Sequence, residues 1–168
     1  MLTQHLTARA VCTIRHERAY DFDVSRGVWL RRLVAEEQIH NILTNPGRVA
    51  IHTFVYGTAA QRTTANLGAN GLSYIGLSNN GSAPAASDSA LAAELSGSGL
   101  SRAAGTVTLP TGAGTLTTIS HTFTYSGVPT QDVQKAALFD AATGGNMAHE
   151  ILFTARTLVT NDNLTLTF

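Results

Sequence analysis

The amino-acid sequence predicts a mainly β protein: an antiparallel β-sandwich or jelly-roll-like domain with an N-terminal arm and one or two short helices. Two observations predict this fold. From residue 71 onward, short runs alternate apolar and polar residues, as strands do when one face lies in a core. Turns rich in Gly, Asn and Asp separate these runs without intervening helical patterns, which is typical of packed antiparallel sheets.

The length of 168 residues suits one domain with an appended segment. We expect an N-terminal arm at residues 1–27, a helical segment packing on the domain at 28–57, and the β-sandwich at 58–168. Residues 1–48 hold seven of the eleven basic residues, so the two parts of the chain are expected to face different environments.

The expected helical segment begins with "VWLRRLVAEEQIHNIL" at residues 28–43, where apolar residues recur three and four apart. This spacing predicts an amphipathic helix. Pro46 disfavours helix for the residue before it, so the helix is expected to stop there. The next run, "RVAIHTFVYG" at 48–57, is ambiguous: its β-branched residues favour a strand, but Val49, His52 and Tyr56 could share one helical face. We expect a second short helix.

The strands of the sandwich are expected at residues 72–78, 105–109, 117–125, 132–141, 146–155 and 163–168. In the third run, Ile119, His121 and Phe123 share one face and threonines occupy the other, which predicts an antiparallel strand with one side in the core. The turns "PTGAG" and "ATGGN" are interpreted as hairpin connections, and "ALAAELSGSGLSR" as an excursion between strands.

Composition narrows the possible functions. The formal net charge is +0 and charged residues make up 13% of the chain, so nothing in the charge indicates nucleic acid or an anionic membrane. The single Cys12 excludes an internal disulfide framework and is consistent with a reducing cytosol. The N-terminus lacks the apolar core of a signal peptide, and no apolar run approaches the roughly 20 residues of a membrane span, so we expect a soluble protein.

No motif in the sequence indicates catalysis. The Gly-rich turns have neither the Lys nor the helix start of a phosphate loop, and the Gly-Ser run at 96–99 is not a nucleophile elbow. The six histidines lack the spacing of metal ligands. Two alternatives stay open: one His gathered on a threefold axis of subunits, and Ca²⁺ at loop carboxylates. We therefore expect no enzyme, no catalytic residue, no cofactor and no metal.

The arm and the helical segment carry the candidate partner-binding residues. Arginines favour bidentate contacts with carboxylates, and exposed aromatic side chains often anchor interfaces. The alternative interpretation is a solvated arm with the tryptophan packed on the domain. DNA binding by the arm is a third and weaker interpretation, because the excess of basic over acidic residues is small. The candidates are Arg9, Arg15, Arg18, Tyr20, Trp29, Arg31 and Arg32.

Three segments of the C-terminal part form a recognisable series: "GLSYIGLSNNGSAPAASDSALAAEL", "GLSRAAGTVT" and "VQKAALFDAATGGNMAHEILFTARTLVTNDNLTLTF". This series resembles a class of small bacteriophage virion proteins. The likeness covers about residues 38–168. It implies a structural, noncatalytic role in a phage particle and action as an oligomer.

From this resemblance we expect a capsid decoration or cement protein that stabilises the head shell by bridging capsid subunits. The expected partners are the major capsid protein or other virion proteins and further copies of the chain, with a homotrimer favoured. Neither nucleic acid nor a membrane is expected as a partner. The expected location is the virion, assembled in the host cytoplasm. The alternatives are a tail component, such as a fibre or adaptor segment, and a host-glycan binding module that uses Trp29 or Tyr74 as a stacking platform.

Overall fold

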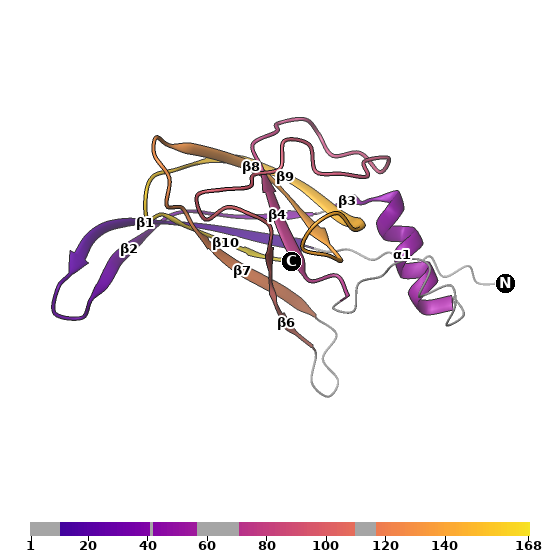
Figure 1. Cartoon of the computed structure of the whole chain (residues 1–168), viewed down its shortest axis with the longest axis horizontal. Coiled ribbons are helices and arrows are strands. Elements are labelled where there is room, and N and C mark those ends of the chain that lie inside the picture. Colours follow the sequence, from indigo (N-terminus) through magenta and orange to yellow (C-terminus); the bar gives the residue numbers. More distant parts are fainter. Residues whose placement is uncertain (1–10, 41, 57–70, 110–116) are drawn as a thin grey trace.

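A computed structural model describes residues 11–40, 42–56, 71–109 and 117–168. The described residues form two antiparallel sheets of five strands each, with a helix at one end (Figure 1). The prediction of a mainly β, antiparallel sandwich is confirmed.

The first sheet has the strand order β2-β1-β10-β7-β6. Its strands are β2 Val28–His40, β1 Val11–Asp23, β10 Asn163–Thr167, β7 Thr118–Thr124 and β6 Thr106–Thr108. The second sheet has the order β3-β9-β8-β4-β5. Its strands are β3 Ile42–Leu43, β9 Met147–Leu158, β8 Gln131–Phe139, β4 Tyr74–Ser78 and β5 Ala103–Ala104.

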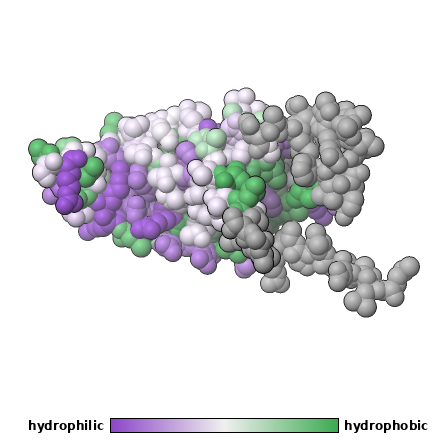
Figure 2. Space-filling view, turned by 90° about the horizontal axis from the view of Figure 1, so that it is seen from below, coloured by the Kyte–Doolittle hydropathy of each residue, from purple (hydrophilic) through white to green (hydrophobic). Residues whose placement is uncertain are grey.

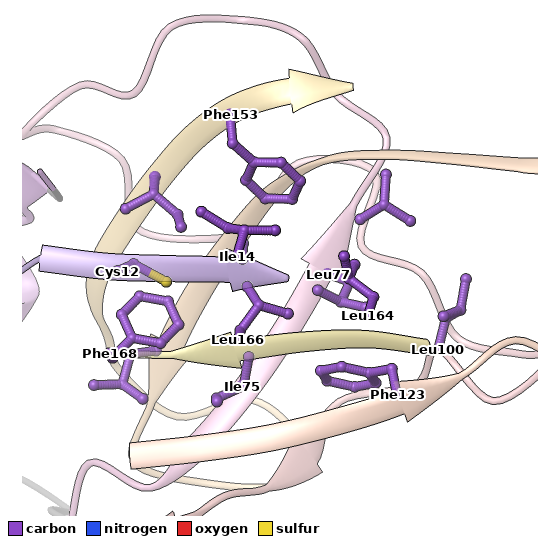
Figure 3. Packing of buried hydrophobic residues seen from close by; sticks show 14 of the residues in the cluster. Cys12, Ile14, Ile75, Leu77, Leu100, Phe123, Phe153, Leu164, Leu166 and Phe168 are labelled. Atoms are coloured by element: carbon purple, nitrogen blue, oxygen red, sulfur yellow. The ribbon is translucent and has the colours of Figure 1, made fainter. Parts of the chain in front are cut away.

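The main hydrophobic core lies between the two sheets. Side chains from β1, β10 and β7 meet those of β4 and β9, and they point toward one another in Figure 3. Alternation decides which residues enter this core: in β7, Phe123 is buried while Thr122 and Thr124 on either side of it are exposed. The largest members of the core are fully buried and include Ile14, Ile75, Leu77, Phe123, Ile151, Leu164 and Leu166.

The N-terminal segment differs from the expectation. Residues 11–23 were assigned to an arm outside the sandwich, but they form β1, which pairs with β10 on one side and β2 on the other. Cys12 and Ile14 have no exposed surface. The next buried position of β1 is the polar His16, so the alternation of apolar residues is too short to be recognised in the sequence. Residues 1–10 of the expected arm lie outside the described residues.

The expected amphipathic helix at 28–43 is wrong: this segment forms β2 and β3. Its apolar spacing of three and four does not mark a buried face, because Leu33 and Val34 are both exposed. Pairing with the whole length of β1 decides the conformation, so tertiary context overrides the local pattern.

The second expected helix, at 48–57, is confirmed as α1 Asn45–Tyr56. The Thr44 hydroxyl caps it by accepting a hydrogen bond from the Gly47 amide at 3.2 Å. Pro46 was interpreted as a stop signal, yet it lies in the first turn, where its missing amide costs no helical hydrogen bond. Gly47 is needed there because a Cβ would come within 2.3 Å of the Ala148 carbonyl oxygen of β9.

The β8–β9 hairpin, which carries much of the phage resemblance, is tied to the preceding loop by one arginine. Arg102 forms a bidentate ion pair with Glu94, at 2.7 Å for both bonds. It donates to the carbonyl oxygens of Ala141 and Gly144 and lies 3.4 Å from the centroid of the Phe139 ring. The resembling segments are therefore one hydrogen-bonded structural unit.

Candidate partner-binding site

The outer half of the β1–β2 hairpin projects beyond the rest of the sandwich, at the end opposite α1 (Figure 1). β1 pairs with β10 only from Thr13 to Glu17, whereas its pairing with β2 continues as far as Asp23 opposite Val28. Residues 18–32 therefore form a two-stranded ribbon, which we call the projecting hairpin.

The turn of the projecting hairpin is internally hydrogen-bonded. Asp23 accepts hydrogen bonds from the Ser25 amide at 3.0 Å and the Ser25 hydroxyl at 2.6 Å. The hydroxyl contact is the main cause of the lowered pKa of Asp23. Gly27 closes the turn with a φ of +65°, a conformation that favours glycine. These contacts give the end of the hairpin a defined shape.

Large apolar side chains at the end of the projecting hairpin are exposed. The Phe22 and Trp29 rings meet edge to face, with centroids 5.2 Å apart. Figure 2 shows hydrophobic residues beside strongly polar ones at this end of the molecule. An isolated two-stranded ribbon is only marginally stable in water, and clustered exposed apolar residues indicate an interaction site. The exposed fractions are 58% for Tyr20, 42% for Phe22, 84% for Val24, 48% for Val28 and 44% for Trp29. We call these five residues the apolar tip.

At its base, the projecting hairpin is anchored to the turn between β9 and β10. Asp162 is fully buried and accepts hydrogen bonds from His16 Nε2 at 3.0 Å and Arg18 Nε at 3.3 Å. Arg18 also donates to the Thr157 carbonyl oxygen at 3.2 Å, and Arg31 donates to the carbonyl oxygen of Asn161. These contacts fix the direction in which the hairpin leaves the sandwich.

The structure divides the arginine candidates into different roles. Arg18 and Arg31 anchor the hairpin, because their guanidinium groups bond to Asp162 and to the Asn161 carbonyl oxygen. Arg15 lies on β1 before the projecting part and pairs with Glu17 at 2.7 Å. Arg32 is exposed. Arg9 lies outside the described residues.

The aromatic candidates lie together at the apolar tip. Trp29 is not packed on the domain, so that alternative interpretation is wrong; it contacts Phe22 instead. Sequence reasoning missed Phe22, Val24 and Val28. Their signal was period-two alternation beside the turn sequence Ser-Arg-Gly, in "AYDFDVSRGV". Tyr74, the other suggested glycan platform, is half-buried and packs against the cluster of Leu91, Ala137, Phe139 and Met147.

Other buried or half-buried ionisable groups lie on strands of the sandwich, away from the projecting hairpin. Lys135 and Glu150 pair at 3.1 Å with almost no exposure, and burial raises the pKa of Glu150 despite this partner. Burial lowers the pKa of His149. It also raises the pKa of the Cys12 thiol to about 12. In the described parts of the chain, no three His, Cys, Asp or Glu side chains are grouped so that they could hold a metal ion.

Comparison of the chain with known protein families and with curated protein sequences finds no match. The resemblance to phage virion proteins therefore stays a prediction. Within the described residues, no helix combines the length and the apolar character needed to cross a bilayer.

Proposed function

We propose that the chain is a structural component of a bacteriophage particle, a decoration or cement protein that stabilises the head shell by bridging capsid subunits. The resemblance of residues 38–168 supports the phage assignment. The observation that carries the mode of attachment is the projecting hairpin, which presents the apolar tip on an anchored base.

Attachment occurs by insertion of the apolar tip into an apolar site on a capsid subunit. Phe22 and Trp29 support each other before binding, so little side-chain freedom is lost when they are buried. Aromatic residues surrounded by polar ones are the usual anchors of interfaces. Many copies around the shell multiply a modest contact into strong retention.

In this mechanism the arginines that were candidate partner-binding residues do not make the main contact with the capsid. Arg18 and Arg31 act indirectly, because they hold the hairpin on the β9–β10 turn while the aromatic residues make the contact. Removal of residues 1–27 would remove β1 and its core residues Cys12 and Ile14, so a deletion is not a suitable test of attachment.

Point substitutions at the apolar tip test the proposal. The double variant Phe22→Ser with Trp29→Ser should remain folded, because both side chains are exposed. We expect it to lose most of its binding to phage heads assembled without the chain, measured as copies retained per particle. Val49→Ser is the matched control, since Val49 is 64% exposed but lies on α1. Retention of the double variant at the parent level would refute attachment by the tip.

The exposed Trp29 also favours a second candidate, a host-glycan binding module with this side chain as the stacking platform. A glycan array with the parent and Trp29→Ser distinguishes the two: selective, Trp29-dependent binding to a sugar supports the second candidate. Gold labelling of intact particles separates a head protein from a tail component.

A further inference from the structure

The two faces of the projecting hairpin differ in chemistry. From Val28 to Leu33, consecutive residues of β2 enter the pairing with β1, so their side chains alternate between the two faces. One face carries Trp29, with Phe22 directly opposite it, and Leu33 continues this face at the base of the hairpin. We call these three residues the aromatic face. The other face, which we call the arginine face, carries Val28, Leu30 and Arg32, with Arg18 opposite Arg32.

Both faces present large apolar side chains to solvent. Leu33 is 51% exposed, as Phe22 and Trp29 of the same face are at 42% and 44%, and Val28 on the arginine face is 48% exposed. Within the described residues, no third strand pairs with the ribbon beyond the sandwich (Figure 1). A flat partner surface covers only one face of such a ribbon, whereas a slot covers both.

The arginine face carries a cation without a partner. Arg18 and Arg32 lie directly opposite each other, a relationship in which like charges repel. The charge of Arg18 is balanced by the buried carboxylate of Asp162, at 3.3 Å from its Nε. Asp21, on the same face, accepts a hydrogen bond from the Phe22 amide. Arg32 is exposed and has no hydrogen bond or ion pair with any described residue.

We propose that the head subunit receives the projecting hairpin in a slot with two unlike walls. An apolar wall lies against the aromatic face, and the opposite wall supplies a carboxylate that pairs with Arg32. Burial of the arginine face is costly unless the partner balances this charge. A carboxylate suits a guanidinium group because the two form parallel hydrogen bonds. The proposal rests on the proposed function and adds the chemistry of the partner site.

A slot of this kind also fixes the orientation of the bound protein. A hairpin turned over about its long axis would place Arg32 against the apolar wall and the aromatic rings against the carboxylate. Such a contact buries a charge without a partner, so it is disfavoured. The two faces together therefore select one way of attachment, which the apolar tip alone does not.

Substitutions of Arg32 test the acidic wall through binding to phage heads assembled without the chain. Arg32→Gln should lower the affinity about tenfold or more, because a charged hydrogen bond is lost. Arg32→Glu should bind more weakly still, since two carboxylates then face each other. Rising salt should weaken binding of the parent more than that of Arg32→Gln, because salt screens the ion pair. Arg48→Gln is the matched control, since Arg48 is an exposed arginine on α1.

A folding role of Arg32 is measured separately. Arg32→Gln removes one member of a like-charge pair, so its free energy of unfolding in urea should be no lower than that of the parent. A weaker affinity then reflects the partner contact and not damage to the hairpin. A clear loss of stability would assign Arg32 to folding and overturn the proposal.

Carbodiimide crosslinking detects the carboxylate directly. The single lysine of the chain, Lys135, is buried in an ion pair with Glu150. Arg32→Lys therefore places an exposed amine on the arginine face, and a carbodiimide joins an amine to a contacting carboxylate as an amide. Mass spectrometry identifies the linked residues. We expect a link to a head subunit from Arg32→Lys and none from Arg48→Lys.

The outcomes separate the slot from the proposed function. Parent-level binding of Arg32→Gln, an unchanged salt dependence, or no crosslink from Arg32→Lys would overturn the acidic wall. If the double variant Phe22→Ser with Trp29→Ser loses binding while Arg32→Gln keeps it, attachment by the tip stands and the slot fails. If the double variant binds at the parent level, both the attachment and the slot fail.

Discussion

Phe22 and Trp29 lie directly opposite each other on β1 and β2, and their rings meet edge to face with centroids 5.2 Å apart. The pair is at the end of a two-stranded ribbon and away from the main core. Its energetic contribution to folding should therefore be that of a cross-strand pair and not that of a core residue.

Trp29→Ser alone should lower the free energy of unfolding by only about 0.2–1 kcal/mol, since this is the usual contribution of a cross-strand aromatic pair. Urea unfolding at constant pH measures the change. Phe123→Ala is the contrast, because Phe123 is buried in the core and its loss should cost about 3–5 kcal/mol. A loss at Trp29 as large as at Phe123 would show that the tip is part of the folding core.

Asp162→Asn should destabilise the base of the projecting hairpin by about 1–3 kcal/mol. The substitution removes the buried negative charge that His16 and Arg18 contact, while Arg18 is 33% exposed and keeps its hydrogen bond to the Thr157 carbonyl oxygen. Urea unfolding gives the energy, and amide hydrogen exchange should become faster in residues 18–32. Asp21→Asn is the control, since Asp21 is exposed and has only a local hydrogen bond to the Phe22 amide. Equal stability of the two variants would contradict the anchoring role of Asp162.

His149 should make the protein less stable as the pH falls below about 6.5. Burial lowers the pKa of His149 from its ordinary value of 6.5, so the unfolded chain takes up the proton first during acidification. The free energy of unfolding therefore falls with decreasing pH until the folded protein also binds the proton.

His149→Gln isolates this effect from that of Glu150, whose raised pKa acts in the opposite direction. The measurement is the free energy of unfolding of parent and variant across this pH range. We expect the parent to show the steeper loss on acidification. Parallel curves for the two proteins would mean that His149 titrates alike in the folded and unfolded states.

Cys12 should be inert in the native protein. Its thiol is fully buried, and burial raises its pKa to about 12, so almost no reactive thiolate exists near pH 8. Mass spectrometry after treatment with iodoacetamide should show no adduct under native conditions and a single adduct in denaturant. Rapid native labelling would place Cys12 outside the core.

The sequence pattern was sufficient where apolar residues mark the buried positions and insufficient where a buried position is polar. The β7 segment was predictable from its alternation, and the β8–β9 segment because a Gly-rich turn separates two apolar runs. β1 was not, because its alternating buried positions are Cys12, Ile14 and the polar His16. The segment forming β2 resembles a helix locally, and only its pairing with β1 makes it a strand.

The sequence allowed some residues of the candidate site to be recognised, but it did not allow the roles of the arginines to be inferred. Tyr20 and Trp29 were recognised as possible anchors, and both are exposed at the apolar tip. The roles of Arg18 and Arg31 could not be inferred, because their acceptors at residues 157–162 lie more than a hundred positions away in the chain. A hydrogen bond between such distant segments depends on the completed sandwich.

Photo-crosslinking in assembled particles tests the central claim most directly. A benzophenone amino acid is placed at Tyr20 in the apolar tip and, in a separate variant, at Val49 on α1, since both positions are exposed. If the hairpin attaches the protein to the shell, illumination should link the Tyr20 variant to a head subunit, identified by mass spectrometry, and should not link the Val49 variant. Crosslinks from Val49 but not from Tyr20 would contradict attachment by the projecting hairpin.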